Sequence, residues 1–259
     1  MLVTYDPYSG TLGRFPRADI IRRVAEAGYE GLNLPVREPF MNAEKEADVD
    51  EAVELLGDCG LRVNTLTFGK NECTTPGKQQ EMQEWLDVVL FVADKLGASV
   101  VSIWPNLPAG VSVEAARETL RENLERMIPI ADAENCVIGL EFEKGCALDN
   151  YREGIAFIDE VDPRLQLTAD TYHLNNDNAD LYIAAVALEG LLSDVHISGS
   201  HRGEPGSAGD TIDYEAFMKG LRESGYAGDL VLQYHLEDPE SMSRACQFTK
   251  GLRAKVLWR

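Results

Sequence analysis

Four side chains that could bind a metal ion stand at or near the ends of short apolar runs in the second half of the chain. The runs at 137–141 and 165–170 end in the carboxylates of Glu141 and Asp170. The next run places an imidazole at His196, and the run at 230–233 ends in the amide of Gln233. This set is mostly oxygen, so it suits Mn²⁺, Mg²⁺ or Co²⁺ better than a structural zinc ion. The sequence indicates a site for one divalent metal ion.

Each of these residues also has an ordinary structural interpretation. A carboxylate at a strand end, such as Asp170, is often a helix N-cap or the start of a turn. His196 stands inside an apolar run and could be a buried core imidazole, whereas His201 and His235 could simply be exposed. The metal interpretation is favoured because four consecutive predicted strands each place a potential ligand at the same end.

Trp104 offers a second kind of chemistry. It ends an apolar run and is followed by Pro and Asn. An indole at that position is either part of the core or a platform for the apolar face of a sugar ring. Glu143 and Lys144, which are adjacent in the sequence, could alternatively form a surface ion pair.

The elements that must position these residues alternate regularly along the chain. Apolar runs predict eight strands, at 2–5, 31–36, 61–68, 99–104, 137–143, 165–169, 191–198 and 229–234. Helical spacing predicts eight helices, at 18–27, 48–56, 79–96, 114–134, 150–161, 180–188, 214–223 and 239–256. Alternation of buried strands and helices indicates an α/β fold with a parallel sheet. We predict one (β/α)8 TIM barrel over residues 1–259, with a doubly wound sheet as the rival; no Gly-x-Gly-x-x-Gly follows the first strand.

The composition argues against several classes of partner. The net charge is −20 and the isoelectric point about 4.5, so nucleic acid and anionic membranes would be repelled. No apolar run approaches the roughly 20 residues of a membrane span, and the first residues do not resemble a signal peptide. Five scattered cysteines form no CxxC pair. We expect a reduced, cytoplasmic protein that binds neither nucleic acid nor membrane.

Taken together, the site motifs resemble those of the xylose isomerase-like superfamily of sugar isomerases and epimerases. The matching segments are Gly139-Leu-Glu141-Phe, Asp170-Thr-Tyr-His173, Val195-His196-Ile-Ser, Ser200-His-Arg202, Pro205-Gly-Ser-Ala-Gly-Asp-Thr-Ile-Asp213 and Gly225-Tyr-Ala-Gly228. The similarity is strong from Val137 onward and weak in the first hundred residues. The superfamily also contains a DNA-repair nuclease, but the acidic charge argues against that activity here.

The resemblance implies a TIM barrel with one divalent ion, most often Mn²⁺. By position its ligands would be Glu141, Asp170, His196 and the residue on strand eight, Gln233. His173 and Arg202 match positions that contact substrate in relatives, and Trp104 would bind the sugar. Relatives also imply a sugar or polyol substrate and a homodimer or homotetramer.

Gln233 is a departure from the family pattern. Relatives similar to the ketose 3-epimerases carry glutamate there, and a glutamate on each face of the sugar moves a proton beside the carbonyl. An amide can bind a metal through its oxygen but has no proton-accepting form near neutral pH. Glu141 would remain as one base, assisted by His173, Glu143 or Lys144, unless a residue such as His235 serves the second face.

These features predict a metal-dependent sugar isomerase, epimerase or lyase that acts on a small polyhydroxy carbonyl compound. One base and a Lewis acid suffice for aldose–ketose isomerisation or for β-elimination. The alternative, suggested by Gln233, is a catalytically silent barrel that binds sugars or serves as an accessory subunit.

Overall fold

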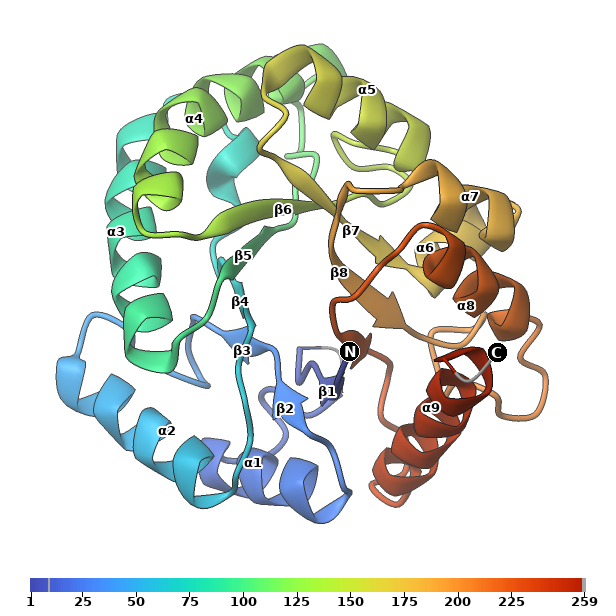
Figure 1. Ribbon diagram of the computed structural model, residues 1–259. Coiled ribbons are helices and arrows are strands. Elements are labelled where there is room, and N and C mark those ends of the chain that lie inside the picture. The colour runs from blue at the N-terminus through green and yellow to red at the C-terminus, as the bar shows by residue number, and fades with distance from the viewer. Residues whose placement is uncertain (9, 258–259) are drawn as a thin grey trace.

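The computed structural model describes residues 1–8 and 10–257. All strands are parallel and belong to one sheet, whose order is β2-β1-β9-β8-β7-β6-β5-β4-β3. The strands are β1 (Val3–Tyr5), β2 (Gly31–Leu32), β3 (Leu34–Pro35), β4 (Thr65–Thr67), β5 (Val100–Ile103), β6 (Val137–Glu141), β7 (Gln166–Asp170), β8 (Leu192–Ile197) and β9 (Leu230–Leu232). Figure 1 shows helices surrounding these strands as an outer ring. The predicted TIM barrel is confirmed.

The helices lie between the strands, as the sequence pattern predicts. They are α1 (Arg17–Glu26), α2 (Glu46–Asp58), α3 (Gln79–Leu96), α4 (Val113–Ala133), α5 (Tyr151–Val161), α6 (Thr171–Asn176), α7 (Leu181–Ala187), α8 (Tyr214–Glu223) and α9 (Ser241–Leu257), with a 3-10 turn at Glu72–Thr74. The short helix α6 and the 3-10 turn are additions to the prediction. None of the helices described is long and apolar enough to cross a membrane.

The predicted second strand is divided in two, so the sheet has nine strands instead of eight. Its first part, β2, pairs with β1, and its second part, β3, pairs with β4. The change of partner occurs at Asn33, whose backbone N–H still donates to Tyr5 O at 2.9 Å. Because β2 and β3 follow one another in the chain, the two ends of the strand order meet and the barrel is nearly closed.

The core is aliphatic and aromatic on both sides of the strands, which explains their apolar sequences. A close approach inside the barrel depends on Gly139 of β6. A Cβ built at this position would lie 2.2 Å from Ser193 Oγ and 3.5 Å from Thr168 Oγ1. Only glycine fits this contact without a shift of the neighbouring strands, and Gly139 stands two residues before Glu141.

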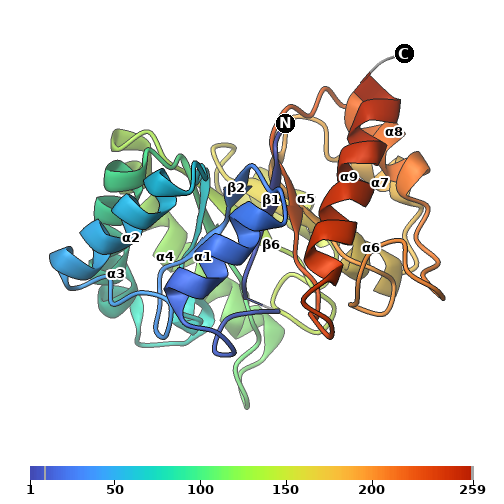
Figure 2. The ribbon, with the colours of Figure 1, turned by 90° about the horizontal axis from the view of Figure 1, so that it is seen from below.

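The amino ends and the carboxyl ends of the strands lie at opposite ends of the barrel. β1 begins beside the end of α9, where Arg253 Nη1 donates to Met1 O at 3.0 Å. Figure 2 shows the start of β1 and the end of α9 at the same end of the molecule. Since all strands are parallel, their carboxyl ends meet at the opposite end, where active sites of TIM barrels lie.

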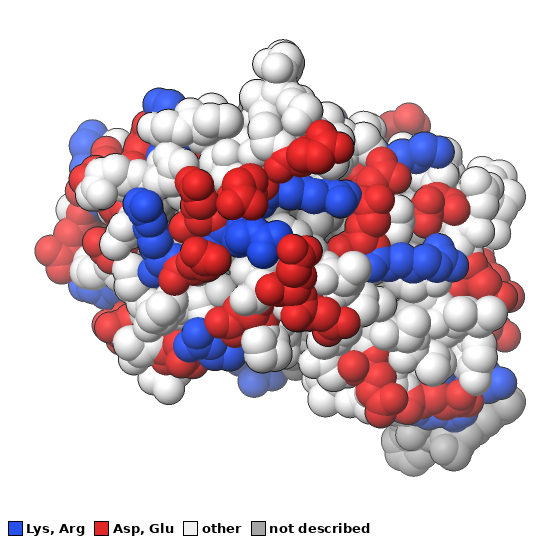
Figure 3. Space-filling view, turned by 90° about the horizontal axis from the view of Figure 1, so that it is seen from above, with Lys and Arg blue, Asp and Glu red and all other residues white. Residues whose placement is uncertain are grey.

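Charged residues cover the helices in mixed patches. Over α4 and α5, Figure 3 shows acidic and basic side chains interleaved. Arg117 of α4 pairs with Glu153 of α5, and Arg121 Nη2 lies 2.6 Å from Glu160 Oε1. Such exposed pairs each contribute at most about 1 kcal/mol. They tie neighbouring helices together but do not decide the fold.

Candidate active site

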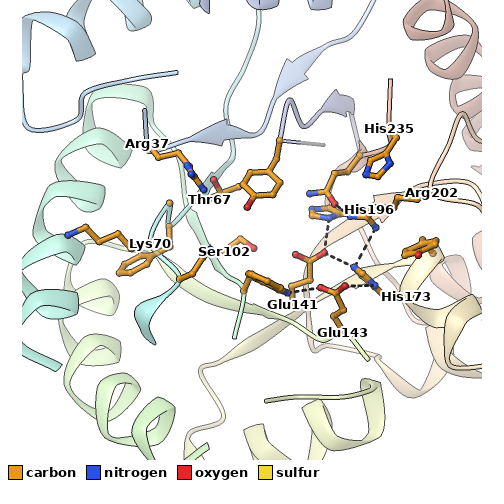
Figure 4. A pocket seen from close by; sticks show the side chains of 17 residues that line it. Arg37, Thr67, Lys70, Ser102, Glu141, Glu143, His173, His196, Arg202 and His235 are labelled. Carbon is orange, nitrogen blue, oxygen red and sulfur yellow. Dashed lines mark hydrogen bonds and ion pairs between the residues drawn. The ribbon is translucent and has the colours of Figure 1, made fainter. Parts of the chain in front are cut away.

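A pocket of about 480 Å³ opens where the carboxyl ends of the strands meet. Its lining contains several of the residues predicted from the sequence: Trp104, Glu141, His173, His196, Arg202 and Gln233. Figure 4 shows that Glu141, Glu143 and His173 share one side, whereas Arg37 and Lys70 lie on the wall across from them. The sequence prediction therefore identified residues that meet in space.

Asp170 serves two functions in the local structure. It is the last residue of β7 and the N-cap of α6, and its Oδ1 accepts a hydrogen bond from Tyr172 N at 2.7 Å. Its Oδ2 accepts one from Arg202 Nη1 at 2.5 Å. The cap fixes the carboxylate and starts the short helix that carries His173. The N-cap interpretation of Asp170 is therefore confirmed for Oδ1, and Oδ2 faces Arg202 at the site.

Glu141 lies beside two imidazoles. His196 Nδ1 lies 3.3 Å and His173 Nε2 lies 3.7 Å from Glu141 Oε1. Burial raises the pKa of the Glu141 carboxyl, but His196, His173 and Arg202 outweigh this and lower it to about 2. Glu141 is therefore ionised, and it can accept a proton, over the whole neutral range.

His196 lies between two carboxylates. Its Nδ1 faces Glu141, and its Nε2 lies 3.6 Å from Asp194 Oδ2. Burial lowers the pKa of this imidazole, but Asp194 and Glu141 outweigh burial and raise the pKa well above 6.5. Asp194 in turn accepts a hydrogen bond from Asn33 Nδ2 at 2.7 Å. A carboxylate behind a histidine is the usual arrangement that orients a metal ligand.

Arg202 joins the two sides of the site. Its Nη1 donates to Asp170, its Nη2 donates to Gln233 Oε1, and Nη1 lies 3.4 Å from His173 Nε2. The backbone of Arg202 has φ +60°, in the left-handed region. Apart from glycines, only Asn135, Asn178 and Arg202 adopt positive φ among the described residues. Such strain in a bulky residue concentrates at functional sites, because the surrounding structure must enforce it.

Trp104 and Glu143 form the wall beside His173. The indole Nε1 of Trp104 donates to Glu143 Oε2 at 2.7 Å, and Glu143 Oε1 lies 3.9 Å from His173 Nδ1. Glu143 lines the pocket while Lys144 is exposed, so the structure does not contain the ion pair that was the alternative interpretation of these two residues. Trp104 is half-buried and lines the pocket, so it is available to a ligand.

The donor atoms fit a divalent metal ion. Ligand atoms of Glu141, Asp170 and His173 lie within 4.8 Å of one another, and all three residues are buried. In addition, Glu141 Oε1 and both ring nitrogens of His196 are buried without a hydrogen bond to any described residue. Buried polar atoms without partners are costly, and a divalent ion held by Glu141 Oε1 and one ring nitrogen of His196 would satisfy two of them. This group contains His173 and includes neither His196 nor Gln233 of the predicted ligand set. Both imidazoles nevertheless face Glu141.

The sequence interpretation did not give roles to Asp6 and Asp194. Asp194 is two residues before His196 in the same strand, so both side chains lie on the same face. That spacing is a signal that could have been used. Asp6 follows β1 and is fully buried, and its Oδ2 accepts from Gln233 Nε2 at 3.3 Å. This contact joins residues at opposite ends of the chain, so no local pattern reveals it.

Comparison with known proteins now identifies the family. The model of the xylose isomerase-like TIM barrel family matches residues 21–252, and the chain belongs to this family. It is 34% identical to an L-ribulose 3-epimerase of Mesorhizobium japonicum over 80% of this chain and 72% of the relative. It is 23% identical to a ketose 3-epimerase of Arthrobacter globiformis over 82% of this chain and 75% of the relative.

A solved structure shows the same fold. The D-allulose 3-epimerase of Methylomonas sp. in complex with D-allulose has a TM-score of 0.82 and 22% identity, covering 97% of this chain and 96% of that chain. The predicted superfamily is confirmed. The relatives are named as sugar epimerases, which agrees with the predicted class of enzyme and does not favour the silent-barrel alternative.

Proposed function

We propose that the protein is a metal-dependent ketose epimerase that inverts the carbon beside the carbonyl of a small sugar. One observation carries the proposal: ligand atoms of Glu141, Asp170 and His173 lie within 4.8 Å of one another, and Glu141 and His173 line the pocket at the carboxyl ends of the strands. The similarity to an L-ribulose 3-epimerase and a ketose 3-epimerase supports a ketose as the substrate.

We assign Glu141, Asp170, His196 and Gln233 as the metal ligands, with Mn²⁺ as the preferred ion. The oxygen-rich set favours a hard cation. A bound divalent ion supplies Lewis-acid polarisation of a carbonyl, which acidifies the neighbouring C–H. His173 completes the cluster and is the alternative to His196, since both imidazoles face Glu141.

Glu141 is the proposed base for the carbon beside the carbonyl, because its carboxylate is ionised and can take up the proton that leaves this carbon. Inversion also needs a proton on the opposite face, and His235, which lines the same pocket, is proposed to supply it. His173 and Arg202 lie on the same side and are hydrogen-bond donors to the oxygen that gains charge as the proton leaves. A guanidinium held between Asp170 and Gln233 needs little reorganisation for this task.

Trp104 is proposed to bind the apolar face of the sugar. Its indole is fixed by the hydrogen bond to Glu143, so the ring presents a preorganised surface to the pocket. Glu143 retains an oxygen near His173 that can accept a substrate hydroxyl. The cavity of about 480 Å³ has room for a monosaccharide and bound water.

Gln233 specifically favours a second candidate, aldose–ketose isomerisation with one base. An amide cannot take up the proton on the second face, whereas isomerisation returns the proton to the neighbouring carbon on the same face. The two reactions share the proposed ligands and Glu141. They differ in product, because epimerisation gives a new ketose and isomerisation gives an aldose.

The test is incubation of the protein with Mn²⁺ and a panel of ketopentoses and ketohexoses, with separation of the products by chromatography. We expect a 3-epimeric ketose, loss of activity in EDTA with recovery on adding Mn²⁺, and loss in Glu141→Gln. An aldose product would establish the second candidate. No turnover of any panel sugar by protein that carries stoichiometric Mn²⁺ would refute both.

A further inference from the structure

The amide of Gln233 is held by two partners that differ in their hydrogen-bonding capacity. On one side, Nε2 donates to Asp6 Oδ2 at 3.3 Å. On the other side, Oε1 accepts from Arg202 Nη2. The two side-chain atoms of an amide are often interchangeable in a structure, but they are not so here. An ionised carboxylate can only accept and a guanidinium can only donate, so one orientation of the amide satisfies both partners.

Asp6 is well placed to enforce that orientation. It follows β1, is 0% exposed and does not line the pocket, so it does not touch a substrate. Its Oδ1 accepts from Tyr8 N at 2.8 Å, which fixes the carboxylate in place. The oxygen of Gln233 is thereby directed away from Asp6, toward Arg202 and the pocket.

We propose that Asp6 is a positioning residue that acts through Gln233, and that the two residues together replace a single glutamate on the last strand. The proposal rests on the assignment of Gln233 as a metal ligand in the proposed function. Asp6 holds the nitrogen, so the neutral oxygen of the amide stays on the side of Arg202, where it would be available to a bound metal ion. The negative charge of this side of the site resides on Asp6, behind the ligand.

One consequence reverses a simple expectation. Restoring the glutamate with Gln233→Glu would not recreate the family site, because the new carboxylate would face Asp6 at about the distance of the present hydrogen bond. Two carboxylates at that separation repel each other, or share one proton, in a buried site. Exchanging both residues, as Asp6→Asn with Gln233→Glu, reverses the polarity of the hydrogen bond and keeps it.

The first measurement is the Kd for Mn²⁺ by calorimetry in wild type, Asp6→Asn and Asp6→Ala. Loss of a partner behind a metal ligand commonly weakens metal binding by about 10–100-fold, so we expect Kd to rise at least about tenfold in Asp6→Ala. Asparagine has a single oxygen, which can accept from Gln233 Nε2 or from Tyr8 N but not from both, so a smaller rise is expected in Asp6→Asn. Asp48→Ala is the control, since Asp48 accepts from Asn42 N and pairs with Arg17 far from the pocket.

The second measurement needs no metal ion. Thermal unfolding in EDTA at pH 8 should show a lower Tm for Gln233→Glu than for wild type, and a recovery of most of this loss in Asp6→Asn/Gln233→Glu. The same pair of variants should show the same order in Mn²⁺ affinity.

The outcomes separate the two proposals. Equal Mn²⁺ affinity in Asp6→Ala and wild type would overturn the positioning role. An unchanged Tm in Gln233→Glu, or no recovery in the double variant, would overturn the pairing itself. Wild-type protein that binds no Mn²⁺ would refute the metal-dependent function and the ligand-positioning role, while the Tm data would still decide whether Asp6 and Gln233 are coupled.

Discussion

The charge balance around Glu141 predicts how the metal-free protein responds to Glu141→Gln. The interactions with His196, His173 and Arg202 lower the pKa of this carboxyl from 4.5 to about 2. A change of one in pKa corresponds to about 1.4 kcal/mol. The net lowering of the Glu141 pKa therefore stabilises the fold by about 3 kcal/mol at a pH where this carboxyl is ionised in both the folded and the unfolded protein. The same value is expected from leaving a buried charge without its partner. Glutamine removes this contribution and leaves His196 facing only Asp194.

The sign of the pH dependence follows from the direction of the pKa change. A carboxyl whose pKa is lower in the folded state stabilises the fold above its unfolded pKa, and this contribution disappears as the pH falls through the folded pKa. The difference between wild type and Glu141→Gln should therefore be constant at about 3 kcal/mol from pH 7 down to about 5. It should shrink below pH 4.5 and reach about half its value near pH 3.

The assay is urea unfolding in EDTA, followed by circular dichroism, at pH 7, 5 and 3. Glu125→Gln on the exposed face of α4 is the matched control, and it should change the free energy of unfolding by less than about 0.5 kcal/mol. Equal stability of Glu141→Gln and wild type at pH 7 would refute this account of the site, and so would a difference that grows as the pH falls from 5 to 3.

Three further predictions test other parts of the structure. Trp104→Phe removes the donor to Glu143, so KM should rise about tenfold with a smaller effect on kcat in steady-state kinetics. An unchanged KM would count against the indole as a platform for the sugar. Gly139→Ala places a methyl group 2.2 Å from Ser193 Oγ and should cost about 1–3 kcal/mol, visible as a fall in Tm by calorimetry; an unaltered Tm would show that the strands can move apart. Arg37 lines the pocket and has no carboxylate within 4.0 Å among the described residues. Arg37→Met should therefore raise KM several-fold while Tm stays within about 1 °C of the wild-type value. A larger drop in Tm would assign Arg37 a structural role instead.

The barrel could be predicted from the sequence because its elements are local. Each buried strand is an apolar run of a few residues, and each helix carries its own periodicity and stop signal, such as Gly97 after α3 with φ +67°. The division of the second strand could not be predicted in this way. It depends on Asn33 meeting one neighbour on each side, and those neighbours, β1 and β4, are distant in sequence.

The difference between local patterns and contacts distant in sequence also explains which candidate site residues the sequence indicated. Glu141, Asp170, His196 and Gln233 stand at strand ends, and the parallel topology alone brings strand ends together. The side chains that contact these residues could not be predicted. The contact of Glu143 could not be predicted, because its partner, the Trp104 indole, follows a separate strand, β5. Neither local periodicity nor spacing contains such contacts.

Asp170 shows why a structural and a functional interpretation of one residue need not compete. A carboxylate has two oxygens, and capping α6 uses only Oδ1. The capping bond fixes the rotation of the carboxylate, so Oδ2 is directed at Arg202 and lies 4.0 Å from His173 Nε2. Residues three apart on a helix share a face, which is how Asp170 and His173 come to flank the same point. The cap is therefore the means by which the strand end is made into part of the site, and a cap at this position strengthens the assignment of Asp170 as a ligand.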